Sequence, residues 1–437
     1  MLDHSRSPRL VVAILATFAF LLLPGATGST SAQFGEAAGF TEIMMPYYLR
    51  RDLSLFEVSL ELDDAQAAIL ESLYMDYEDS QEASKVAMME RFSTMKEELD
   101  AKSETEVMEL VFRPFEEKAE DWEKLNDAFL YNVQAILSSQ QVDAWPRFER
   151  ELRRQKELPK GKYAGENIDV IEIASLLELD REARDEIDIV LEDYGIALDA
   201  MLARRTDVLR GSRLPMMRSI QENDMNASLK LYEEQIAARI GVRDVNDEYT
   251  AIVWESLPDD ARDFFLNEIY VRAYPRVYGR KTSAHRLIMG ASEINDLDPD
   301  TLAAIIELQD NYQTELESLN QRLVELIRRH EPDDDRFRAR AYVMRAQGET
   351  PTRPDDPTRE AFRERQRLDN QYAETLKSML TPEQFAGLPG AGRFADRAGP
   401  DDDVHLSPTG DPAGPDLNLG PASSGSAGGK SRGGGRK

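Results

Sequence analysis

The chain has 437 residues and a formal net charge of −29, from 82 acidic and 53 basic residues. A charge of this sign disfavours binding to nucleic acids and to anionic lipid surfaces, because both are themselves negative. The absence of cysteine excludes disulfide bonds, thiolate metal sites and cysteine nucleophiles.

The N-terminal segment, residues 1–32, has the pattern of a secretory signal peptide. Arg6 and Arg9 precede an apolar run over residues 10–23, and small residues follow it. This run is shorter than the roughly 20 residues that a membrane-spanning helix needs, so we expect cleavage rather than anchoring. The sequence therefore predicts a periplasmic or secreted protein with no membrane span after cleavage.

After a lead-in segment over residues 33–54, one pattern occurs three times along the chain. A segment rich in leucine and aspartate around Asp63 returns around Asp180 and Asp298, and a tyrosine follows each copy at one offset: Tyr77, Tyr194 and Tyr312. A second segment also repeats, around Asn126, Asn246 and Asp369. Tandem repetition of this kind indicates a modular, elongated protein built from three units: 55–160, 168–282 and 290–390.

Within each unit the apolar residues are spaced by threes and fours, which is the period of an α-helix. In the third unit this seam resembles a coiled coil: Ile305, Leu308, Tyr312, Leu316, Leu319, Leu323 and Leu326. The sequence thus predicts an all-α fold of three tandem long antiparallel helical hairpins. Pro114 should kink or split one helix. The Gly-, Pro- and Ser-rich tail, residues 391–437, should be disordered.

A short motif stands before each arm of each predicted hairpin. A leucine is followed by a residue whose side chain can accept hydrogen bonds from the first free amides of a helix, and in three copies a glutamine completes a capping box. The exception is Leu257, which Pro258 follows. The motif residues are Leu62, Asp63, Gln66, Leu137, Ser138, Gln141, Leu179, Asp180, Leu297, Asp298, Leu380, Thr381 and Gln384.

This pattern resembles the LTxxQ-motif family of periplasmic proteins, to which Spy and CpxP belong. Residues 380–384 fit the Leu-Thr-x-x-Gln pattern outright, and residues 62–66 and 137–141 fit it with Asp or Ser in place of Thr. Members of the family carry two such motifs in a single helical hairpin, whereas this chain would contain three hairpins. The resemblance implies ATP-independent binding of unfolded proteins, or sensing of envelope stress, with unfolded or envelope proteins as partners.

The candidate residues for binding such partners are flexible or aromatic apolar side chains at two places: Met88, Met89, Phe92, Met95, Leu214, Met216 and Met217. The same residues could instead pack the helix cores. No motif supports a metal site, a cofactor or catalysis, so we expect a protein that is not an enzyme. The alternative function is a structural helical-repeat scaffold of the cell envelope with no client binding. The oligomeric state stays open.

Overall fold

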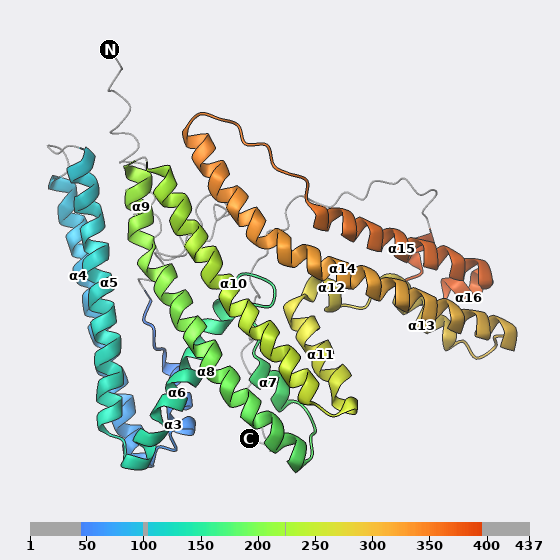
Figure 1. The fold of residues 1–437 in the computed structure, drawn as a ribbon, viewed down its shortest axis with the longest axis horizontal. Coiled ribbons are helices and arrows are strands. Elements are labelled where there is room, and N and C mark those ends of the chain that lie inside the picture. The colour runs from blue at the N-terminus through green and yellow to red at the C-terminus, as the bar shows by residue number, and fades with distance from the viewer. Residues whose placement is uncertain (1–44, 99–103, 223, 396–437) are drawn as a thin grey trace, which may run out of the picture.

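The computed structural model describes residues 45–98, 104–222 and 224–395. All regular elements in these ranges are helices, which confirms the all-α prediction. Three antiparallel hairpins dominate the architecture (Figure 1), built from α4 and α5, from α8 to α10, and from α14 and α15. None of the described helices is long and apolar enough to cross a bilayer. The predicted signal segment, residues 1–32, and residues 396–437 of the predicted tail lie outside the described ranges.

The first unit begins earlier than the sequence predicts. Tyr48, in the segment assigned to the lead-in, is buried against Phe56 and Phe129. Of the kink or split predicted at Pro114, the split is wrong, because one helix continues through that residue. The elements of this unit are η1 (Arg50–Asp52), α3 (Leu53–Ser59), α4 (Asp64–Glu98), α5 (Glu104–Ala135), α6 (Ser139–Glu157) and η3 (Leu158–Lys160).

The second unit has the largest core. Its long helix buries an apolar face that includes Ile187, Tyr194 and Leu198, against residues of the return helix such as Val242 and Val253. Arg205, which falls on the same face, is also fully buried. The elements are α7 (Val170–Ser175), α8 (Arg181–Gly211), α9 (Arg213–Gln221), α10 (Met225–Ser256), α11 (Asp259–Ala273) and α12 (Pro275–Tyr278).

The third unit extends beyond its predicted end at residue 390. Ala391 and Phe394 are buried in its core, so residues 391–395 belong to the folded unit and not to the tail. A loop that contains Pro351 and Pro354 separates the two arms of the hairpin, and Pro357 begins the second arm. The elements are α13 (Ser283–Ser292), α14 (Pro299–Ala346), α15 (Pro357–Met379), α16 (Pro382–Ala386) and α17 (Gly392–Ala395).

The segment between the first two units, residues 161–168, is a joint that is held by buried charges. Glu166 is fully buried and pairs with Arg205 of α8 at 2.7 Å and with Arg239 of α10 at 3.1 Å. Its carboxylate also accepts hydrogen bonds from the amides of Lys162 and Tyr163. Buried charges are tolerated only when they are paired and hydrogen-bonded, and here that condition is met.

The third unit reaches the same joint through α14. Asp335 accepts a hydrogen bond from the Tyr163 hydroxyl at 2.9 Å and pairs with Lys162. Glu331 accepts one from the amide of Ala164 at 2.8 Å. Arg205 also donates a hydrogen bond to the carbonyl of Glu157, at the end of α6 in the first unit. All three units therefore meet at this joint.

Candidate functional site

The predicted methionine surface is only partly available for binding. Met88 and Met216 are buried, so the prediction that they contact partners is wrong, and they pack within the fold instead. Met89 is 40% exposed, and Leu214 is partly buried. The side chains of Phe92, Met95 and Met217 lie outside what the structure describes. These residues do not define a site.

Three copies of the leucine motif form capping boxes. Asp63, Ser138 and Thr381 each accept a hydrogen bond from the amide three residues later, and the glutamine side chain there accepts one from the capping residue's amide. Asp180 and Asp298 also cap their helices, through the amides of residues 183 and 301. At the remaining copy, Pro258 provides no side-chain cap.

In the first unit the two motif glutamines also bind each other. The Gln66 amide donates to Gln141 Oε1 at 2.8 Å and to the carbonyl of Ile136, at the end of α5. The Gln141 amide donates to Gln66 Oε1 and to the carbonyl of Leu60, after α3. We call this pair of side chains the glutamine bracket. It satisfies carbonyl groups that helix ends leave free.

The second unit lacks both glutamines and uses arginines instead. Arg184 donates to the carbonyls of Ala174 and Leu177, and Arg262 donates to those of Trp254 and Glu255. Leu177 stands at the repeat position of Leu60, so this carbonyl is satisfied in both units, by a different side chain in each. The motif therefore acts as a structural device, because it joins the ends of consecutive helices.

The repeated tyrosines have an equally structural role. Tyr77, Tyr194 and Tyr312 each donate a hydrogen bond from the long helix to Asn126, Asn246 or Asp369 of the return helix, at 2.7, 3.0 and 2.6 Å. An aromatic ring three residues after each partner packs on the tyrosine, with centroids 5.1 to 5.4 Å apart. Burial raises the pKa of each tyrosine, so all three remain protonated donors at neutral pH.

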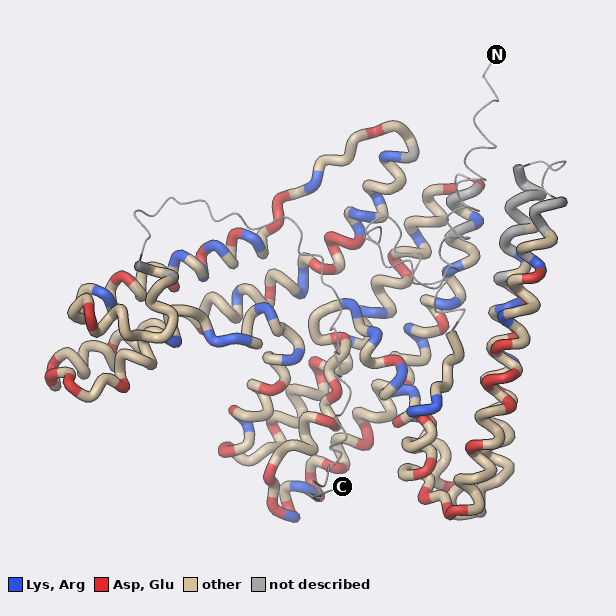
Figure 2. The backbone as a smooth tube through the Cα atoms, turned by 180° about the vertical axis from the view of Figure 1, so that it is seen from behind, with Lys and Arg blue, Asp and Glu red and all other residues tan. Residues whose placement is uncertain are grey.

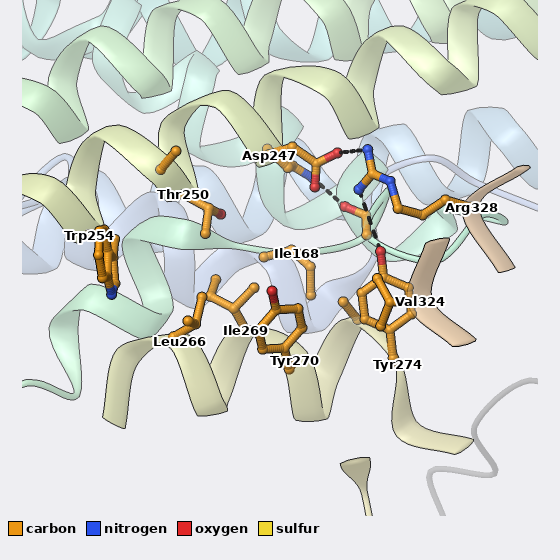
Figure 3. Close-up of a pocket in the computed structure, with 14 residues that line it drawn as sticks. Ile168, Asp247, Thr250, Trp254, Leu266, Ile269, Tyr270, Tyr274, Val324 and Arg328 are labelled. Carbon is orange, nitrogen blue, oxygen red and sulfur yellow. Dashed lines mark hydrogen bonds and ion pairs between the residues drawn. The ribbon is translucent and has the colours of Figure 1, made fainter. Parts of the chain in front are cut away.

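A groove of about 390 Å³ lies between α10 and α11 of the second unit (Figure 3). Ile168, Leu266 and Ile269 contribute apolar side chains to its lining, and Tyr270 lies along one wall. Trp254 stands at one end and remains 37% exposed. The volume and the mixture of apolar and aromatic lining are typical of sites that bind small apolar groups.

The opposite end of the groove is closed by a polar cluster. Arg328 of α14 pairs with Asp247 at 2.5 Å and donates to the Tyr274 hydroxyl at 3.4 Å, as the dashed lines in Figure 3 show. The hydrogen bond from Arg328 to Asp247 raises the pKa of the guanidinium, which therefore stays charged. Because these groups satisfy one another, the interior of the groove carries no spare charge.

The helical pattern of the sequence does not predict this groove, although the repeat contains a signal for it. Three residues before the closing leucine, the second unit has Trp254 where the first has Gln134 and the third has Lys377. Thirteen residues after that leucine it has Tyr270 where the others have arginine. Aromatic residues at positions where the other copies are polar distinguish the second unit.

No protein-family model, curated protein or solved structure matches this chain. Among the residues that the structure describes, no group of three or more His, Asp or Glu side chains is placed to hold a metal ion. The groove is therefore the candidate functional site, on geometry alone.

Proposed function

We propose that this protein is an exported, ATP-independent, chaperone-like binder of exposed apolar segments in other polypeptides. The observation that carries this proposal is the groove between α10 and α11, which offers aromatic and aliphatic surface next to a partly exposed tryptophan. An apolar side chain that entered the groove would be removed from water, and each Å² of apolar surface buried in this way would contribute about 25 cal/mol to the free energy of binding. The Leu-Thr-x-x-Gln motif at residues 380–384, which forms a capping box, supports the relation to the Spy and CpxP group.

The groove also explains why a folded protein would bind unfolded ones without a nucleotide. Its lining is supplied by three helices, α10, α11 and α14, and by the end of the joint, so the site is present before any partner arrives. A preformed site avoids most of the entropy that ordering a flexible surface costs on binding. One such groove takes up one or two side chains, which implies weak and reversible capture.

The test is suppression of aggregation. The purified protein, without ATP, is titrated into a client protein that aggregates on heating or reduction, and light scattering is followed. We expect suppression at near-stoichiometric amounts. The variant Ala251→Trp fills the groove from an exposed position of its lining and should reduce suppression at least tenfold. Ala237→Trp, at another exposed position of the same helix, is the matched control and should retain activity.

If the protein does not suppress aggregation at several-fold excess, the chaperone proposal is wrong. A structural scaffold of the cell envelope is then the better account. The observation that favours it is the buried joint, which ties all three units together. A scaffold would bind one defined partner, and Ala251→Trp would leave that binding unchanged.

A further inference from the structure

The two helices that form the groove carry an excess of acidic residues. Between residues 244 and 268 the chain has eight acidic residues and one basic residue. In Figure 2 the corresponding stretch of backbone has many acidic and few basic positions. The groove is therefore an apolar surface between strongly acidic walls.

Several of these acidic side chains form no ion pair within the described part of the protein. Glu248, Glu255, Asp260 and Asp263 are exposed, and none of them forms an ion pair with a described residue. The single basic residue, Arg262, pairs with Asp259 and lies 5.1 Å from the centre of the Trp254 ring. Inside the groove, by contrast, Asp247 is matched by Arg328. The negative charge is thus on the walls, where a bound chain would meet it.

We infer that the groove selects extended segments in which an aromatic or large aliphatic residue is flanked by lysine or arginine. The apolar side chain enters the groove, and the flanking cations lie against the acidic walls of α10 and α11. Acidic segments are repelled by the same walls. This inference rests on the proposed function and adds the substrate class to it.

The experiment uses three fluorescein-labelled peptides that share one central phenylalanine and a Gly-Ser backbone. Their four flanking residues are all lysine, all serine or all glutamate. Fluorescence anisotropy with the full protein should show that the lysine peptide binds at least tenfold more tightly than the glutamate peptide at low ionic strength. This difference should shrink at 0.5 M salt, where charges on a surface are strongly screened. A lysine peptide with glycine in place of phenylalanine measures attraction by charge alone.

Two variants locate the interaction. Glu255→Lys with Asp263→Lys places a positive charge on each wall without touching the groove lining, and should reduce the advantage of the lysine peptide over the glutamate peptide. The matched control, Asp76→Lys with Asp79→Lys, makes the same change in total charge on exposed positions of α4 and should leave that advantage unchanged. Ala251→Trp should abolish the advantage of phenylalanine over glycine.

Equal binding of the lysine and glutamate peptides would overturn the inference, as would an equal effect of both charge reversals. The outcome is separable from that of the aggregation test. Suppression that Ala251→Trp reduces, without any preference for charge, would leave the proposed function standing and remove this inference. Selective binding of the lysine peptide without suppression of aggregation would keep the charge preference of the groove and remove the proposed chaperone function.

Discussion

At the scale of single residues, the three buried tyrosines show what the repeat preserves. Each one places a hydroxyl group where the long helix meets the return helix, and the partner is always an Asn or Asp side chain. In the first two units the hydroxyl also accepts a hydrogen bond from an amide of the preceding segment, Tyr47 or Val170. The tyrosine therefore fixes three parts of the unit together, and a phenylalanine would leave two buried groups without partners.

Asp356 provides a residue-scale test of pH dependence. Burial would raise the pKa of its carboxyl, but hydrogen bonds from Thr358 and the charge of His330 lower it below the usual range. A carboxyl with a lower pKa in the folded state stabilises the fold above its ordinary pKa of about 4. That stabilisation is lost as the pH falls through the folded-state pKa.

We therefore expect the urea midpoint of the wild-type protein to fall more steeply between pH 5 and pH 3 than that of Asp356→Asn. At pH 7 the variant should be the less stable of the two. The exposed Asp296→Asn is the control and should follow the wild-type curve. Parallel curves for wild type and Asp356→Asn would show that the carboxylate does not contribute in this way.

At the scale of helices and their connections, the glutamine bracket should matter more than an isolated capping box. Gln141 closes the box at Ser138 and also binds Gln66 and the carbonyl of Leu60. Gln384 closes only the box at Thr381. We expect Gln141→Ala to lower the free energy of unfolding by about 1–2 kcal/mol and Gln384→Ala by about 0.5–1 kcal/mol. Urea denaturation followed by circular dichroism measures both, and the reverse order would contradict the role of the bracket.

The helical elements could be predicted from the sequence because their signals are local. The spacing of apolar residues and the capping motifs both depend on neighbouring residues, and the structure contains both. The predicted split at Pro114 is wrong because the packing of α5 against α4 can offset the cost of a proline inside a helix. The boundaries at residues 54 and 391 were wrong because Tyr48 and Phe394 are held by distant side chains.

The groove was beyond prediction for a related reason. Its lining comes from segments as far apart as Gly165, Trp254 and Arg328, which only the packing of α14 against the second unit brings together. Met88 and Met216 were assigned to a surface because a methionine in an amphipathic helix has the same sequence pattern whether it is exposed or buried. Burial against another helix decides between the two.

At the scale of the whole molecule, the buried joint should control stability. Arg205 is one of its central charges, and its removal would leave Arg239 as the remaining ion-pair partner of the buried Glu166. Breaking a buried ion pair from one side costs about 3–5 kcal/mol. Arg205→Leu should therefore lower the free energy of unfolding by about that amount, while Arg204→Leu, at the exposed neighbouring position, should have little effect.

Because the joint takes groups from all three units, this loss should appear in a single transition. Circular dichroism and tryptophan fluorescence should give the same urea midpoint for Arg205→Leu. Separate transitions for the two signals would mean that the units unfold independently and that the joint does not couple them.

The joint also sets an order of events in time. Lys162 and Asp335 are 173 residues apart in the chain, so their contact forms only after most of α14 has been synthesised. Contacts between residues so distant in sequence slow folding, because a long loop must close first. We therefore expect the first two hairpins to acquire their helices early and to remain loosely connected until α14 arrives. Although the sequence contains three separate copies of one pattern, the joint that holds them together is complete only when the third unit has folded.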